Sequence, residues 1–235
     1  MMVAAGHGVL QAIFPLAAAA IAFVFAVRLG DLVRRKHRPQ DVAWFVAMLM
    51  FAVASFAMFL GVLLGWTALE FRIYWLFGAV LNVPFLFVGE AYLLFRRRIW
   101  AHLIAAVTVV LAVYATVVVL GAPINESALD ATLPLGKDVF GSTAAHGLAQ
   151  IYGNTAYGLL LLGLLWSMFS MRGRPELRDQ MTGILLIAVG ASVVAVGSGI
   201  GAAFGIVALF SVGLAAGIAV MFAGFLRASR PRASV

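Results

Sequence analysis

Residues 42–65 read VAWFVAMLMFAVASFAMFLGVLLG, an apolar run without a charged side chain. A helix of about 20 such residues spans the hydrocarbon core of a bilayer. The rest of the chain is similar, since 64% of its 235 residues are hydrophobic and 11% are charged. Soluble globular proteins carry about 45–50% apolar and about 25% charged residues. We therefore exclude a soluble domain and predict an all-α integral membrane protein.

Seven stretches are long and apolar enough to span a bilayer as helices. They lie at about 8–29, 42–65, 73–95, 99–121, 144–169, 181–199 and 205–226. Basic segments separate most of them, namely RRKHRPQD at 34–41, RRR at 96–98 and RGRPELRD at 172–179. The last two spans are separated only by GSGIGAAFG at 197–205, for which we expect a tight join.

The distribution of positive charge predicts the orientation. All of the 16 Lys and Arg residues except Arg72 and Lys137 fall on one side of the predicted topology. That side is cytoplasmic by the positive-inside rule, which places the N-terminus outside and the C-terminus in the cytoplasm. We expect a multi-pass protein of a cell membrane, most simply a bacterial inner membrane. The net charge of +7 is then a collar facing lipid headgroups, and nucleic acid is not an expected partner.

Two similar boxes indicate an internal repeat. HGVLQ at 7–11 and HGLAQ at 146–150 both open a predicted span on the outer side. We interpret the chain as one domain, 1–235, with a 3+1+3 parallel pseudo-repeat: residues 1–98 and 144–235 are the halves, and 99–143 is the linker. Parallel repeats occur in transporters. Chance similarity between two sequences rich in Ala, Gly, Leu and Val is the alternative.

Polar side chains inside apolar spans are costly and are therefore candidates for function. On the fifth span, four of them share one helical face. We predict a ligand-binding site in the outer half of the bundle, formed by Gln11, Glu70, Arg72, Asn82, His146, Gln150, Asn154 and Tyr157. The alternative is that these side chains only solvate helix ends and hydrogen-bond to neighbouring helices.

Glu90 is the one carboxylate well inside a predicted span. Such residues serve as proton- or ion-coupling groups in pumps and transporters, and we assign Glu90 this candidate role. A salt bridge to a neighbouring arginine, Arg28, Arg97 or Arg172, is the alternative.

Metal and cofactor chemistry has little support. The chain has no cysteine, which excludes disulfides and thiolate sites. His7 and His146 open equivalent spans and are candidate metal or haem ligands, because a haem needs only axial histidines. Zinc normally takes four ligands. The sequence leaves the identity of any cofactor open.

Glycines recur every four residues on the last two spans, at Gly197, Gly201 and Gly205 and at Gly213 and Gly217. Small residues at this spacing let membrane helices approach closely. We expect packing within the chain. A homo-oligomer or a larger membrane complex formed through the same face is the alternative.

Three resemblances concern topology more than activity. FRIYWLFGAVLNVPFL at 71–86 resembles the third helix of microbial rhodopsins, but retinal needs a Schiff-base lysine on the seventh helix, and both lysines here lie in loops. The Pro39-Gln40 pair resembles the PQ-loop transporters, although it also lies in a loop. The third span and MFAGFLRA at 221–228 are similar to uncharacterised bacterial seven-helix membrane proteins, which implies no activity.

Enzyme motifs such as GxSxG and HExxH are absent from the sequence. We predict a non-enzymatic membrane protein that binds or translocates a small molecule or ion, as a transporter or sensor. The alternatives are an accessory or structural subunit of a larger membrane complex and a protein that binds haem, metal or quinone.

Overall fold

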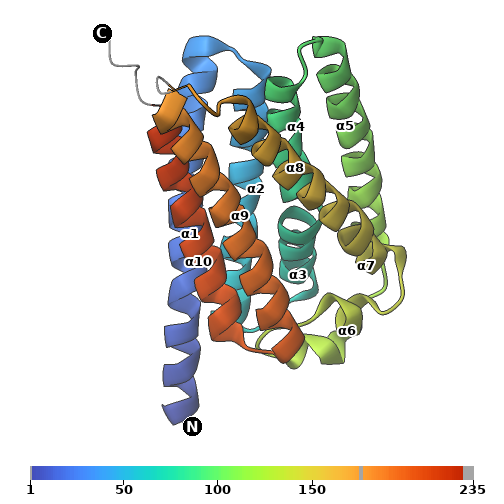
Figure 1. Cartoon of the computed structure of the whole chain (residues 1–235). Helices are drawn as coiled ribbons and strands as arrows, with labels where there is room; N and C mark the ends of the chain where they lie inside the picture. Colours follow the sequence, from blue (N-terminus) through green and yellow to red (C-terminus); the bar gives the residue numbers. More distant parts are fainter. Residues whose placement is uncertain (1, 175–176, 230–235) are drawn as a thin grey trace.

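The computed structural model describes residues 2–174 and 177–229, and side chains from residue 11 onward (Figure 1). Seven of its helices are long and apolar enough to cross a membrane, as predicted. Five spans are single helices: α1 (Met2–Lys36), α2 (Pro39–Leu64), α5 (Arg98–Gly121), α9 (Arg178–Phe204) and α10 (Val207–Ala228). The third span is α3 (Ala68–Tyr74), which continues through the π-helical segment η1 (Trp75–Leu81) into α4 (Asn82–Leu94). The fifth span is α7 (Ala144–Leu148), which continues through the π-helical segment η3 (Ala149–Gly153) into α8 (Asn154–Ser170).

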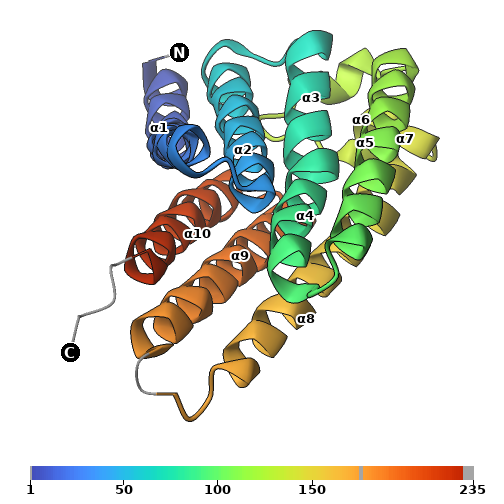
Figure 2. The same cartoon turned by 90° about the horizontal axis from the view of Figure 1, so that it is seen from above.

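The spans form two rows (Figure 2). One row contains α1, α2, α3–α4 and α5, and the facing row contains α10, α9 and α8. Contacts of α1 with α10 and of α4 with α8 join the rows, whereas α5 lies at the edge, mainly against α4, η1 and α7. The connections α1–α2, α4–α5 and α8–α9 and the last turn of α10 lie at one end of the bundle, which we call the basic end (Figure 1).

The join between the last two spans is shorter than the sequence suggested. We predicted a sixth span that ends at about residue 199 and a tight join to the seventh, and α9 continues to Phe204. Gly205 ends it in the left-handed conformation, with φ of 65°, and its N–H bonds back to the last turn. Of the upstream glycines, Gly197 and Gly201 pack directly against α10.

Glycines line the whole contact between α9 and α10. A Cβ on Gly190 would lie 2.6 Å from the carbonyl oxygen of Gly217, and one on Gly197 would lie 2.8 Å from the Cα of Gly213. The two backbones therefore touch directly, as expected for small residues in lipid. The glycine face therefore packs within the chain, as expected. A homo-oligomer or a larger membrane complex formed through it stays a prediction.

The end opposite the basic end is covered by the segment between α5 and α7, which includes η2 (Glu126–Asp130) and α6 (Gly136–Phe140). Trp66 donates its indole N–H to the carbonyl of Thr132 at 3.1 Å, and Leu129 and Leu133 are buried. Gly136 lies directly against the ring of Trp75, with no room for a Cβ. We call residues 122–143 the capping segment.

The internal repeat and the orientation in the membrane stay predictions. The two π-helical segments lie in the third and fifth spans. The predicted repeat pairs the third span with the seventh and the fifth with the first, so the π-helical segments do not follow it.

Candidate functional site

Two charged residues of the predicted outer site form hydrogen bonds with other residues of the chain. Glu70 belongs to a capping box, in which its Oε2 accepts from the backbone N–H and hydroxyl of Thr67 at 3.0 and 2.9 Å. Arg72 donates to the carbonyl of Val119 and, at 2.7 and 2.8 Å, to those of Leu120 and Ala122. These carbonyls end α5, where no helical partner is available. The binding roles of Glu70 and Arg72 stay predictions.

His146, a residue of the predicted ligand-binding site, lies in an aromatic cluster. Its ring stacks on Trp75 at 5.9 Å, and Trp75 donates its indole N–H to the carbonyl of Ala145 at 2.9 Å. Phe71 and Phe140 complete the packing around Trp75. The Nδ1 of His146 is buried without a hydrogen-bond partner within the described part of the chain.

The structure adds no ligand to the predicted metal site among the side chains that it describes. In residues whose side chains the structure describes, no group of three or more His, Asp or Glu could hold a metal ion. The side chain of His7 lies outside that description. A site using His7 and His146 therefore stays a prediction.

The other polar residues of the fifth span are distributed over its surface. Tyr157 donates to the hydroxyl of Ser192 on α9 at 3.1 Å. Gln150 and Asn154 are exposed, and Gln11 on α1 is half-buried. Neither of the two grooves described below includes these residues.

Asn82 is buried and is the first residue of α4, directly after the π-helical segment η1. Its Nδ2 donates to the carbonyl of Ala47 on α2 at 2.6 Å. Its backbone N–H bonds to the carbonyl of Phe77, five residues back, which is the π-helical pattern. Asn82 therefore ties α4 to α2, and its predicted binding role is not tested by this contact.

Glu90 has the most distinctive setting of the predicted residues. It is 3% exposed, and the Ser167 hydroxyl on α8 donates to its Oε1 at 2.7 Å. The backbone of α8 comes close, because a Cβ on Gly163 would lie 3.0 Å from the Cγ of Glu90. The carboxyl group thus sits in the contact between the two rows of helices.

None of the described arginines forms the expected alternative contact with Glu90, a salt bridge. In the described part of the chain the one salt bridge joins Arg227 to Asp179, at 3.1 Å. Glu90 is instead held by a neutral hydroxyl group. An ionised carboxylate buried without a cation is costly, so residues in this setting usually have a function.

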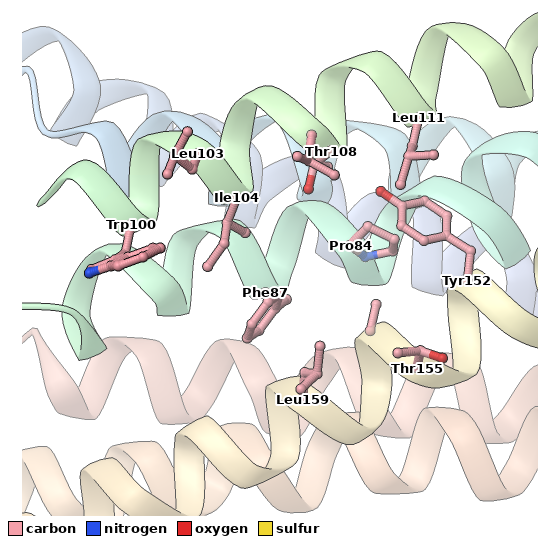
Figure 3. Close-up of a pocket in the computed structure, with 12 residues that line it drawn as sticks. Pro84, Phe87, Trp100, Leu103, Ile104, Thr108, Leu111, Tyr152, Thr155 and Leu159 are labelled. Atoms are coloured by element: carbon pink, nitrogen blue, oxygen red, sulfur yellow. The ribbon is translucent and has the colours of Figure 1, made fainter.

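A groove of about 290 Å³ opens at the surface between α4, α5 and α8 (Figure 3). Its lining is almost entirely apolar and includes Phe87 on α4, Trp100 and Val107 on α5, and Leu159 on α8. Figure 3 shows the hydroxyl of Tyr152, on η3, directed toward α5. A second groove, of about 480 Å³, begins on the other side of Tyr152 and follows α7.

Sequence reasoning missed Ser167 and the groove. Ser167 lies four residues after Gly163, a small-xxx-small spacing that marks close helix contacts, and this signal could have located the partner of Glu90. The groove had no such signal, because its lining residues resemble ordinary lipid-facing side chains. Comparison of the chain with protein-family models, curated proteins and solved structures finds no match.

Proposed function

We propose that the chain is a non-enzymatic membrane protein that binds or moves a small molecule or ion, with Glu90 as its proton-binding residue. It would act as a proton-coupled transporter or a proton-responsive sensor. The observation that supports the proposal is that the buried carboxyl group pairs with the Ser167 hydroxyl and with no cation among the described residues. Intramembrane carboxyl groups of this kind form the proton relays of pumps and transporters.

The coordination chemistry favours a proton over a metal cation. Calcium takes about 6–8 oxygen ligands, whereas the Glu90–Ser167 pair offers one carboxyl group and one hydroxyl. Glu90 is buried, with the α8 backbone at Gly163 close beside it, so water ligands have little access to the pair. A proton needs no such coordination shell.

The depth of Glu90 suits exchange with water at the basic end. Glu90 lies four residues before Leu94, the last residue of α4, which is about 6 Å along the helix axis. By the positive-inside rule, we assign the basic end to the cytoplasm of a bacterial cell. Protons would then reach Glu90 from the cytoplasmic side.

Protonation of Glu90 would change the contact between α4 and α8. Ser167 can donate to a carboxylate, but a protonated Glu90 can itself donate, so the two protonation states make different contacts across the rows. A ligand shifts a conformational equilibrium only by such differential contacts. Gln150 and Asn154 are exposed and are candidates for contacting the small molecule.

A pH jump on protein reconstituted in a solid-supported membrane tests the proposal. Wild-type protein is expected to give a transient charge displacement that Glu90→Gln loses. Glu126→Gln, which removes an exposed carboxylate of the capping segment, is the matched control and should retain the signal. An equal displacement in Glu90→Gln and wild type would contradict a proton-binding role for Glu90.

A further inference from the structure

The groove between α4, α5 and α8 has the length of one membrane leaflet. It follows α5 from Trp100 to Leu111, which at about 1.5 Å per residue is about 16 Å. Half of a bilayer core is about 15 Å thick. The groove ends at Tyr152, beyond which the second groove begins. It therefore runs from the basic end to about the middle of the membrane.

Positive charge gathers at the mouth of this groove. Arg96 and Arg97 lie in the connection from α4 to α5, and Arg98 begins α5. All three are exposed and form no salt bridge with any residue that the structure describes. Arg97 is the N-cap of α5, three residues before Trp100, which lines the groove. Trp100 is itself 55% exposed, as is typical of a tryptophan at the membrane interface.

The groove is small, with a volume of about 290 Å³. A single flexible hydrocarbon chain is narrow enough to enter. It also needs no polar partner along this lining.

We propose that the groove binds an anionic phospholipid, with one acyl chain between α4, α5 and α8 and the phosphate against Arg96–Arg98. Juxtamembrane arginines attract anionic lipids, and basic pockets between membrane helices bind their headgroups. The lipid would bridge α5, the helix at the edge of the bundle, to α4 and α8. This proposal does not depend on the role of Glu90.

Native mass spectrometry of the wild-type chain tests the headgroup. Phosphatidylglycerol and phosphatidylcholine with identical acyl chains are titrated separately, and we expect the first to bind at least about tenfold more tightly. The triple variant Arg96→Gln, Arg97→Gln, Arg98→Gln should lose this preference. The triple variant Arg34→Gln, Arg35→Gln, Lys36→Gln, also at the basic end, should keep it. Equal binding of both lipids to wild type, or equal loss in both triple variants, would overturn the proposal.

A groove-filling substitution tests the position of the acyl chain. Leu159→Trp places a large ring in the groove and should reduce binding of phosphatidylglycerol, whereas Leu162→Trp, on the same helix outside the groove, should not. Thermal unfolding in detergent verifies that both variants fold. Unchanged binding in Leu159→Trp would show that the lipid lies elsewhere. Because the chain has no cysteine, a photo-crosslinker on Val107→Cys reports the occupant directly, and crosslinking to a polypeptide instead of lipid would also overturn the proposal.

Discussion

Gly153 lies so close to Ala79 that a Cβ at position 153 would be 2.7 Å from the Ala79 carbonyl oxygen. Here η1 and η3, the two π-helical segments, meet face to face. Such segments are rare and frequently occur at functional sites. This contact sets how α8 runs along α4, and along the same pair of helices Ser167 reaches Glu90.

Enlarging Gly153 should separate the two π-helical segments. Gly153→Val is expected to lower the free energy of unfolding by about 1–3 kcal/mol, because overpacking a tight contact forces the backbone to shift. The control is Gly158→Val on the same helix, where a Cβ meets nothing within 4 Å. Thermal unfolding in detergent measures the difference. Equal midpoints for the two variants would contradict a direct contact between η1 and η3.

The glycines between α9 and α10 should be equally sensitive. Gly190→Val is expected to destabilise the protein by a similar amount, because its side chain would meet Met221 and the Gly217 carbonyl. Gly199→Val, on the exposed side of α9, is the control. If the glycine face served another copy of the chain instead, Gly190→Val would change the oligomeric state and leave the stability of the monomer intact.

Arg72 should stabilise the last turn of α5. Arg72→Gln removes the guanidinium group that bonds to three terminal carbonyls, and a hydrogen bond to a charged group contributes about 1.5–3 kcal/mol. Hydrogen exchange should accelerate in residues 116–122. Arg72→Lys should rescue it only in part, because an ammonium lacks the planar fork. Arg35→Gln on α1 is the control and should leave the exchange of these residues unchanged. Unchanged exchange in Arg72→Gln would exclude a stabilising role for Arg72.

The capping segment should depend on Gly136. Gly136→Val would collide with the Trp75 ring, so residues 122–143 are expected to detach and become accessible to protease. Gly121→Val, at the end of α5, has open space around its Cβ and should leave the segment protected. Limited proteolysis in detergent compares the two. Equal protection would mean that the capping segment does not rest on Trp75.

The spans could be predicted from sequence because hydropathy is a local property of each helix. The run at 42–65 differs from α2 by only a few residues. The end of α9 was harder to predict, since residues 197–204 stay helical through contacts with α10. The π-helical segments depend in the same way on packing between Gly153 and Ala79, which no local pattern reports.

The candidate site was predictable only in part. Glu90 stood out because a carboxyl group inside an apolar run is costly wherever it points. The spacing of Gly163 and Ser167 marks a close helix contact in the sequence, but that this contact is made with Glu90 on α4 depends on how α8 crosses α4. Glu70 and Arg72 were as conspicuous in sequence, yet their capping contacts involve the chain itself. An unusual residue type therefore identifies a candidate functional position in the sequence, whereas the residues that contact it in the fold determine its role.

The most direct test of the account is pH-difference infrared spectroscopy on the protein in lipid bilayers. We predict a carbonyl-stretch band of a protonated carboxyl group that changes with pH in wild type, disappears in Glu90→Gln and persists in Glu126→Gln. Ser167→Ala should shift the frequency of this band, because it removes the hydroxyl that bonds to Glu90. A band that is unchanged in Glu90→Gln would contradict the proposal that Glu90 binds the proton.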